Sequence, residues 1–259
     1  MILDRARRVL LVAGLPAVLL TAWWFATRDS TSVFWPPLAD ILRAFGPTWL
    51  EGRLTSDVVP SLLRLAAGYG AVIVVGVALG TAIGSSRVVR EVLEPVLEFL
   101  RAVPAPVLVP VIMLFAGIDN TMKISVIAFG CVWPVLLNTV EGVRSVDEVL
   151  RDTGRTYRLG RLTTLTKLTL PGASPQIMTG ARQALSIGII LMVISEMFAA
   201  TNGLGFTTIQ FQRTFAIPQM WTGIILLGII GVLLSLLFKL AERRILHWYL
   251  GIRHTQRKA

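Results

Sequence analysis

Long apolar runs alternate with short polar segments along this chain. A helix needs about 20 mostly apolar residues to cross the hydrocarbon core of a bilayer. Runs of roughly this length lie at residues 9–27, 61–85, 102–118, 123–143, 177–200 and 220–240. The pattern predicts an all-α integral membrane protein in which residues 1–259 form a single domain with about six transmembrane helices.

The first run could be mistaken for a signal peptide, because Arg5, Arg7 and Arg8 precede it. However, the run is long, carries Trp23 and Trp24 at its far end, and lacks a small-x-small cleavage site. We therefore interpret it as an uncleaved signal-anchor helix.

Lys and Arg residues are unevenly distributed between the segments expected on the two sides of the membrane. If the N-terminus is cytoplasmic, 19 of the 25 Lys and Arg residues fall on inner segments and five on outer segments. Basic residues concentrate in cytoplasmic loops. The count predicts that the N- and C-termini both lie in the cytoplasm.

Composition supports the same class. Hydrophobic residues make up 54% of the chain and charged residues 15%, against roughly half and about a quarter in soluble domains. The net charge of +10 is explained by membrane orientation, so we expect no nucleic-acid partner. Cys131 is the single cysteine, which excludes an intramolecular disulfide and a cysteine-based metal site.

Several catalytic signatures are absent from the sequence. There is no G-x-x-x-x-G-K-[ST] phosphate loop, so we expect no ATP hydrolysis and no cofactor in this chain. The two histidines, His247 and His254, both lie in the basic tail. An enzyme acting inside the membrane is therefore poorly supported, and we predict no metal site.

Two segments outside regular spans are expected to have special geometry. Pro104, Pro106 and Pro110 crowd the start of the third run, which predicts a broken or tilted helix. Residues 36–45 form an amphipathic stretch that begins with proline and is expected to lie along the outer membrane surface.

The inner loop at residues 144–176 is polar and helix-permissive. Ser145 and Glu148 form a possible capping box, so we expect a short helix there. A turn and a second helix that stops before Pro171 should follow. Such a loop could dock a soluble partner or lie on the membrane surface.

Two ionisable residues, Arg64 and Glu196, fall inside predicted spans near their outer ends. Charges in a span are costly and usually pair or face a cavity. We expect the two side chains to form an ion pair or to line the outer part of a pathway. Alternatively, Arg64 extends to the surface and Glu196 makes a local capping contact.

Glycines recur at multiples of four residues in the second span, at Gly68, Gly76, Gly80 and Gly84. Small residues at this spacing let helices approach closely. We expect helix packing, with a dimer contact or a pore-facing groove as alternatives.

The inner loop resembles the cytoplasmic signature of permease subunits in binding-protein-dependent ABC importers. That signature reads E-A-A, three residues, G, nine residues, I-x-L-P. Its end is matched by Leu168, Leu170 and Pro171. Its E-A-A positions hold Asp152, Thr153 and Gly154. Arg158 stands where glycine is usual, with Gly160 close by.

The resemblance extends over nearly the whole chain. F-W-P-P-L-A-D-I-L-R-A-F, V-P-A-P-V-L-V-P-V-I-M-L-F-A-G-I and S-E-M-F-A-A-T-N-G-L-G are similar to further elements of that family. The combination is most similar to the nitrate, sulfonate, taurine and bicarbonate branch, and thiamine-precursor permeases also look similar.

The resemblance implies a type I ABC importer permease in a bacterial inner membrane. Two permease copies would form the pathway, and two ATP-binding subunits carrying ATP and Mg would grip the inner loops. A periplasmic or lipid-anchored binding protein would deliver a small solute. The competing classes are a stand-alone secondary transporter or channel, and a membrane scaffold without transport.

Overall fold

The computed structural model describes residues 2–198 and 200–249, with side chains from residue 14 onward. All regular elements in this part of the chain are helical. The α-helices are α1 (Ile2–Thr27), α2 (Leu38–Trp49), α3 (Val59–Ser85), α4 (Arg87–Ala102), α5 (Val109–Ala116), α6 (Asn120–Arg144), α7 (Glu148–Thr156), α8 (Arg161–Thr164), α9 (Leu170–Phe198), α10 (Leu204–Arg213) and α11 (Ile217–Ile245). Three short helical segments lie between these helices. Two are π-helical, η1 (Leu54–Val58) and η3 (Leu165–Thr169), and one is a 3-10 helix, η2 (Ala105–Leu108).

Within the described residues, four helical stretches are long and apolar enough to cross a membrane: Leu54–Ser85, Asn120–Arg144, Arg161–Phe198 and Ile217–Ile245. A fifth span arises if the bent pair Arg87–Ala102 and Ala105–Ala116 is counted as one. The apolar part of α1 with described side chains is shorter, Gly14–Thr27. Part of the predicted first span, residues 9–13, therefore lies outside the described side chains.

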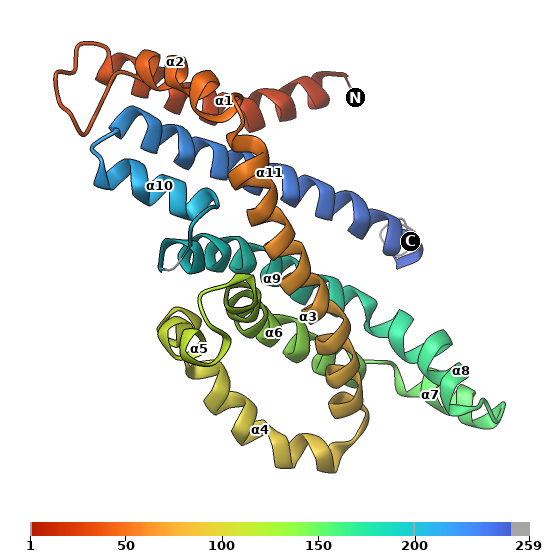
Figure 1. The fold of residues 1–259 in the computed structure, drawn as a ribbon. Coiled ribbons are helices and arrows are strands. Elements are labelled where there is room, and N and C mark those ends of the chain that lie inside the picture. Colours follow the sequence, from red (N-terminus) through yellow and green to blue (C-terminus); the bar gives the residue numbers. More distant parts are fainter. Residues whose placement is uncertain (1, 199, 250–259) are drawn as a thin grey trace.

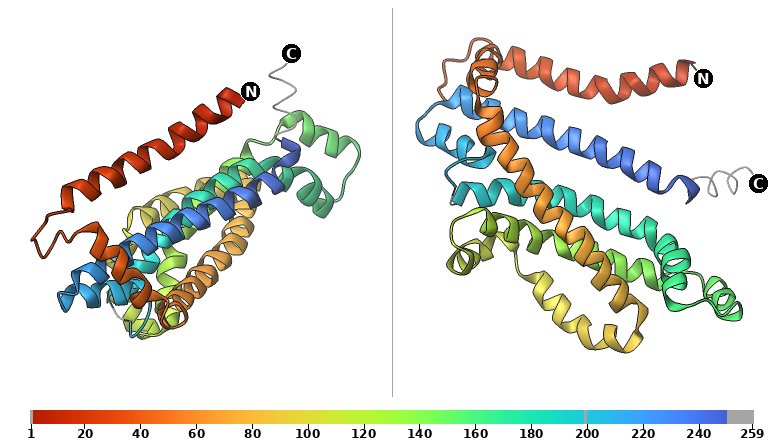
Figure 2. Two further views of the ribbon diagram at one scale, coloured as in Figure 1. Left: turned by 90° about the horizontal axis from the view of Figure 1, so that it is seen from above. Right: turned by 45° about the vertical axis from the view of Figure 1, so that its right-hand side comes forward.

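Helices α3, α6 and α9 form the centre of the molecule (Figure 1). Their apolar side chains build the main core, with Met122, Ile127 and Met192 fully buried. Helix α11 packs against α2 and α10, whereas α1 lies apart from the central helices (Figure 2). The large apolar side chains left exposed on α1 and α11 suit contact with lipid.

The third predicted span, residues 102–118, is divided in the structure. Helix α4 ends at Ala102, and η2 and the eight-residue α5 follow at an angle of 80°. The break falls at Pro104 and Pro106, since proline lacks an N–H donor and disfavours helical backbone in the residue before it. Pro110 lies in the first turn of α5, where no donor is required.

Two expectations for the inner loop are wrong. Ser145 does not cap a helix start: α6 runs to Arg144, so Ser145 is its C-cap and its hydroxyl donates to the Gly142 carbonyl (3.0 Å). The N-cap of α7 is Asp147, whose carboxylate accepts from the Val149 N–H (2.7 Å).

The second correction concerns Pro171, which does not stop a helix. The helix continues from α8 through η3 into α9, and the Leu170 N–H bonds to the Leu165 carbonyl across the π segment. The wider π turn comes just before the residue that lacks a donor. The same arrangement occurs at η1, which ends just before Val59 and Pro60.

Candidate functional site

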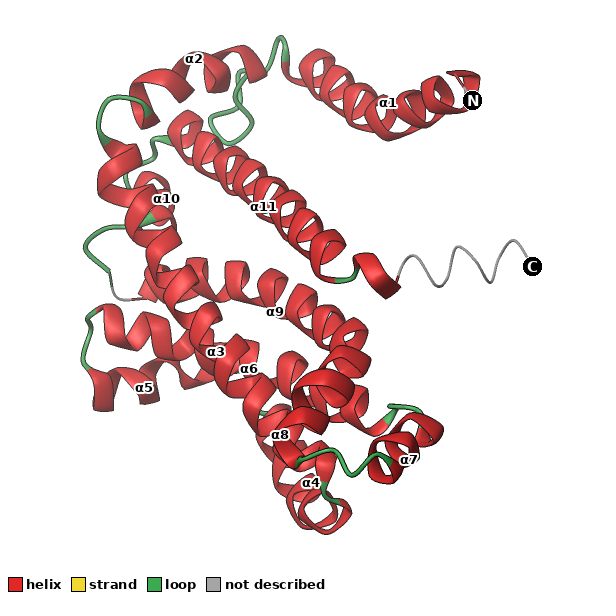
Figure 3. Ribbon diagram, turned by 90° about the vertical axis from the view of Figure 1, so that its right-hand side faces the viewer, coloured by secondary structure: helices red, strands yellow, loops and turns green. Residues whose placement is uncertain are grey.

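A helical hairpin, formed by α7 and α8, extends from one end of the central helices (Figure 3). The Arg151 guanidinium donates to the Val143 carbonyl and so fastens α7 to the end of α6. This hairpin contains the predicted coupling residues from Asp152 to Gly160, whereas Leu168, Leu170 and Pro171 follow it in η3 and at the start of α9.

The turn that ends α7 depends on left-handed backbone at Arg158, where φ is 49°. The Arg158 N–H donates to the Arg155 carbonyl and the Leu159 N–H to the Gly154 carbonyl, both at 2.9 Å. These are the two bonds of a Schellman motif, whose left-handed position is usually glycine. Arginine therefore occupies a glycine conformation at the position where the resembled signature has glycine.

The other predicted coupling residues have different environments. Gly154 is buried, and a Cβ there would lie 2.8 Å from Leu168 Cδ1, so the glycine lets α7 contact η3. Asp152 is exposed and pairs with Arg155 at 3.1 Å. The Thr153 hydroxyl bonds to the Val149 carbonyl (2.7 Å). The remaining three residues lie at boundaries between elements. Gly160 is the residue before α8, and Leu170 and Pro171 are the first residues of α9, where it follows η3.

The hairpin also exposes large apolar side chains. Val149, Tyr157 and Leu162 are 74%, 76% and 74% exposed. Large exposed apolar side chains on a segment that is otherwise polar are typical of a surface that contacts another protein or the membrane. Tyr157 and Leu162 were not singled out from the sequence, although the amphipathic pattern of the loop was visible.

Arg64 and Glu196 meet at the other end of the central helices. Arg64 Nη1 lies 2.7 Å from Glu196 Oε1, and the side chains are 6% and 0% exposed. Glu196 also accepts hydrogen bonds from the Ser61 hydroxyl (2.7 Å) and the Gly205 N–H (3.0 Å). The charge on Glu196 is therefore paired and surrounded by donors, which is the condition under which a buried carboxylate is tolerated.

Arg64 joins three parts of the chain. Besides α9, it donates to Asn120 Oδ1 at the start of α6 (2.8 Å) and to Asn202 Oδ1 in the turn after α9 (2.5 Å). The planar guanidinium offers five donors, so one side chain can hold all three.

Backbone donors of the turn between α9 and α10 point at the same cluster. The Gly203 N–H bonds to Asp57 Oδ1 (3.0 Å) and the Leu204 N–H to the Ser61 hydroxyl (2.9 Å). Gly203 has φ of 122°, and a Cβ there would lie 2.5 Å from Glu196 Cδ. The sequence analysis missed Asp57 and Ser61, although with Arg64 they share one helix face at four- and three-residue spacing.

A polar cavity of about 600 Å³ adjoins this cluster. Arg64, Asn120, Lys123 and Asn202 are among the residues that line it. Lys123 is buried and its ammonium donates to the Ile118 carbonyl (3.0 Å). The cavity thus carries two basic residues, the acidic residue Asp119 and the amides of Asn120 and Asn202 beside the α9–α10 turn.

The four predicted packing glycines all face α6. A Cβ at each would lie 2.9 Å or less from α6 atoms: Gly68 next to Ile127, Gly76 next to Val135, Gly80 next to Thr139, and Gly84 next to the Val140 carbonyl. The absence of side chains therefore sets the close approach of α3 to α6 over most of their length.

Comparison with known proteins gives the class of this membrane protein. The family model described as "Binding-protein-dependent transport system inner membrane component" matches residues 73–247. The fold resembles the inward-facing MetNI methionine ABC transporter, with a TM-score of 0.63 at 18% identity over 73% of this chain and 94% of that chain.

Relatives by sequence are also permeases. The chain is 34% identical to the taurine transport permease TauC of Escherichia coli over 94% of this chain and 91% of that protein. It is 29% identical to the putative aliphatic sulfonates permease SsuC of Bacillus subtilis, covering 90% and 86% of the two chains. It is likewise 29% identical to the nitrate import permease NrtB of Synechocystis, covering 85% and 82%.

The chain belongs to the family of binding-protein-dependent transport system inner membrane components. It is a multi-pass inner-membrane permease of an ABC transporter and is not itself catalytic. Such a system includes a separate ATPase and a binding protein. Membership rules out the stand-alone transporter, channel and scaffold alternatives.

Proposed function

We propose that this permease forms the translocation pathway of an importer for a small solute that carries an anionic group, such as a sulfonate, taurine, nitrate or bicarbonate. The support for the substrate class is similarity to permeases named for taurine, aliphatic sulfonates, nitrate and bicarbonate. A thiamine-precursor-like solute is the alternative.

The proposed assembly has two copies of this chain, two ATP-binding subunits and one periplasmic or lipid-anchored binding protein. Each copy crosses the membrane six times, with α1, the bent α4–α5 pair and the four long spans. The start of α1 and the end of α11 point the same way as the α7–α8 hairpin (Figure 2). That common direction supports cytoplasmic termini and a cytoplasmic hairpin.

The observation that carries the coupling role is the hairpin with exposed Val149, Tyr157 and Leu162. The ATPase covers these side chains in the proposed complex. ATP binding closes the ATPase dimer and draws the two hairpins together. Because η3 and α9 follow α8 without interruption, this displacement reaches the pathway through a continuous helix.

At the outer end, the Arg64–Glu196 cluster holds the α9–α10 turn against α3. In the proposed cycle this joined unit moves as one body when the binding protein docks.

Uptake by proteoliposomes tests the proposal. They would contain this permease and the ATPase and binding protein encoded beside it. Radiolabelled taurine, ethanesulfonate, nitrate, bicarbonate and a thiamine precursor would serve as separate probes. The proposal predicts uptake of at least one anion that requires ATP and the binding protein, and that stops when the P-loop lysine of the ATPase is replaced. Uptake confined to a thiamine precursor would contradict the substrate class.

A further inference from the structure

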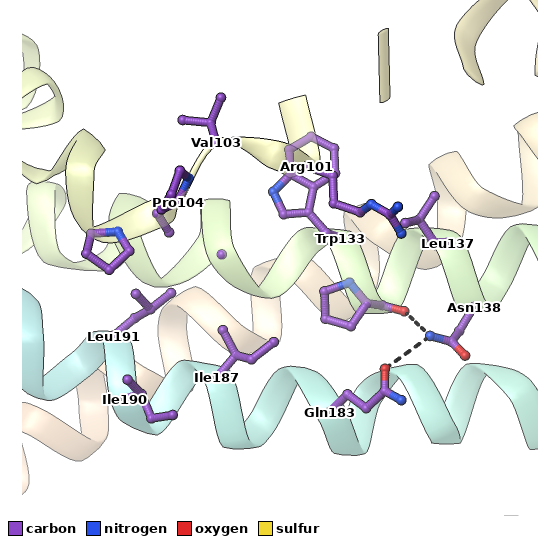
Figure 4. Close-up of a pocket in the computed structure, with 14 residues that line it drawn as sticks. Arg101, Val103, Pro104, Trp133, Leu137, Asn138, Gln183, Ile187, Ile190 and Leu191 are labelled. Atoms are coloured by element: carbon purple, nitrogen blue, oxygen red, sulfur yellow. Dashed lines mark hydrogen bonds between the residues drawn. The ribbon is translucent and has the colours of Figure 1, made fainter. Parts of the chain in front are cut away.

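A second cavity, of about 530 Å³, lies among α4, η2, α6 and α9 (Figure 4). Its volume is within the usual range for small-molecule sites. It is separate from the outer cluster, and neither the family membership nor the relatives assign it a role.

The cavity walls combine an apolar surface with a few polar groups. Val103, Pro104, Ile187 and Leu191 provide apolar wall. Arg101, Trp133, Asn138 and Gln183 bring nitrogen donors to the same space (Figure 4). Among the described residues that line it, Arg101 is the only ionisable one.

The count of basic residues along the sequence places Arg101 on an inner segment, just before the predicted span at residues 102–118. In the structure it lies beside residues of a transmembrane helix. It lies at the last turn of α4, and the cavity it lines is also lined by Gly130 and Trp133 from the middle of α6. Its guanidinium bonds to Glu98 at 2.5 Å through one nitrogen, which leaves other donors available. A cation within a span usually marks a wet pathway or a ligand.

Gln183 shows that this cavity opens away from the core. It lies near the middle of α9 and is exposed in the single chain. Its Oε1 accepts a hydrogen bond from Asn138 Nδ2 at 3.4 Å. This bond does not use the two N–H donors of the Gln183 amide. An exposed amide in an otherwise apolar stretch indicates a face that contacts water and not lipid.

Trp133 adds an unsatisfied donor. Its indole Nε1 is covered from solvent and has no hydrogen-bond partner within the described part of the chain. A buried donor without an acceptor is unfavourable, and an acceptor group reaching the cavity would relieve that cost.

We propose that this cavity is a substrate site on the pathway and that it takes a small monoanion with an apolar tail, an alkanesulfonate. The sulfonate oxygens accept from Arg101, Gln183 and, after a small ring rotation, Trp133. The alkyl tail packs on Ile187 and Leu191. This inference rests on the proposed import of anions and narrows it.

The charge pattern separates candidate substrates. Taurine carries an ammonium group in addition to its sulfonate. No carboxylate is among the described residues that line the cavity, and the nearby Glu98 carboxylate is already paired with Arg101. Nitrate has no tail for the apolar wall. The site therefore favours ethanesulfonate over taurine and nitrate.

The test uses the full permease–ATPase complex with its binding protein in proteoliposomes, and measures the concentration dependence of uptake. Gln183→Leu removes the amide at similar size, Gln183→Glu adds a negative charge, and Trp133→Phe removes only the N–H donor. Arg101→Gln removes the cation at the cavity and should raise the half-saturating ethanesulfonate concentration at least as much as the loss of one hydrogen bond. Arg87→Gln is its matched control, because Arg87 pairs with Glu91 on the same helix outside the cavity. Copurification with the ATPase verifies assembly of every variant.

We expect Gln183→Leu and Trp133→Phe to raise the half-saturating ethanesulfonate concentration about tenfold, the effect of losing a hydrogen bond to a charged group. Gln183→Glu should raise it further and shift the preference toward taurine, while Arg87→Gln should leave it unchanged. If assembled cavity variants take up ethanesulfonate with wild-type kinetics, the site is wrong although the transport function stands. If the wild type shows no ATP-dependent anion uptake, the proposed function fails, and this site with it.

Discussion

Arg64 on α3 and Glu196 on α9 form a buried ion pair, with Nη1 and Oε1 separated by 2.7 Å. The two residues are far apart in sequence, and their contact ties the adjoining ends of two central helices to the turn before α10. The pair is part of a network in which Ser61, Asn202 and Gly205 also participate.

Removing the negative charge of Glu196 should destabilise the protein, because the buried positive charge of Arg64 then has no counter-ion. Glu196→Gln leaves the Arg64 guanidinium buried without a counter-ion, and we expect a loss of about 3–5 kcal/mol in stability. Asp40→Asn is the control, because Asp40 pairs with Arg43 at the surface and such pairs contribute about 0–1 kcal/mol. Thermal unfolding of the purified protein in detergent measures both, and equal midpoints would contradict a structural role for the buried pair.

Gly203 tests whether the turn depends on its contact with Glu196. Gly203→Ala introduces a Cβ 2.5 Å from Glu196 Cδ at a backbone φ of 122°. Gly52→Ala has a similar φ of 107° but open space around the new carbon, so it reports backbone strain alone, about 1–3 kcal/mol. The Gly203 variant should unfold at a clearly lower temperature than the Gly52 variant. Matching midpoints would show that the close contact does not matter.

Arg158→Gly should stabilise the hairpin. A left-handed residue with a Cβ costs about 1–2 kcal/mol, and Arg158 has φ of 49°. Part of the gain is offset by the greater freedom of glycine in the unfolded chain, so a net rise of up to about 1 kcal/mol is expected. Arg158→Ala retains the Cβ and should bring no such gain. Limited proteolysis of the hairpin compares the two, and faster cleavage of the glycine variant would refute the turn geometry.

The packing of α3 on α6 should give alanine substitutions at two glycines of α3 opposite effects on stability. In Gly80→Ala the new Cβ meets Thr139 Cβ at 2.7 Å, so the helices must separate and stability should fall by about 1–3 kcal/mol. Gly70→Ala meets nothing within 4 Å and should gain up to about 1 kcal/mol from helix propensity. Thermal unfolding of both variants checks the signs, and a stable Gly80 variant would contradict the close approach.

Much of the architecture could be predicted from the sequence, because bilayer thickness forces long apolar runs. The spans near Gly68–Gly84 and the position of Arg64 and Glu196 near one end of their spans follow from that periodicity. The division at Pro104 was expected, but the length of α4 and its bend were not. Proline marks where a helix breaks without fixing the direction of the next helix.

Other features depend on tertiary contacts that local patterns do not reveal. The Ser145 capping box failed because α6 extends further than its apolar run, which leaves Asp147 to cap α7. Pro171 was expected to end a helix, yet a π turn accommodates it. Asn120 and Asn202 join the Arg64 network from distant segments, and a single sequence gives no signal for that pairing.

The most direct test of the coupling role is copurification of the permease with its ATPase, followed by measurement of ATP hydrolysis stimulated by the binding protein. Tyr157→Asp combined with Leu162→Asp places two charges on the exposed apolar surface of the hairpin. Val33→Asp is the control, an apolar residue 62% exposed between α1 and α2. The account predicts that the double variant loses the ATPase and the stimulated activity, whereas the Val33 variant retains both. A double variant that binds the ATPase and shows full stimulation would contradict the assignment of the α7–α8 hairpin as the coupling element.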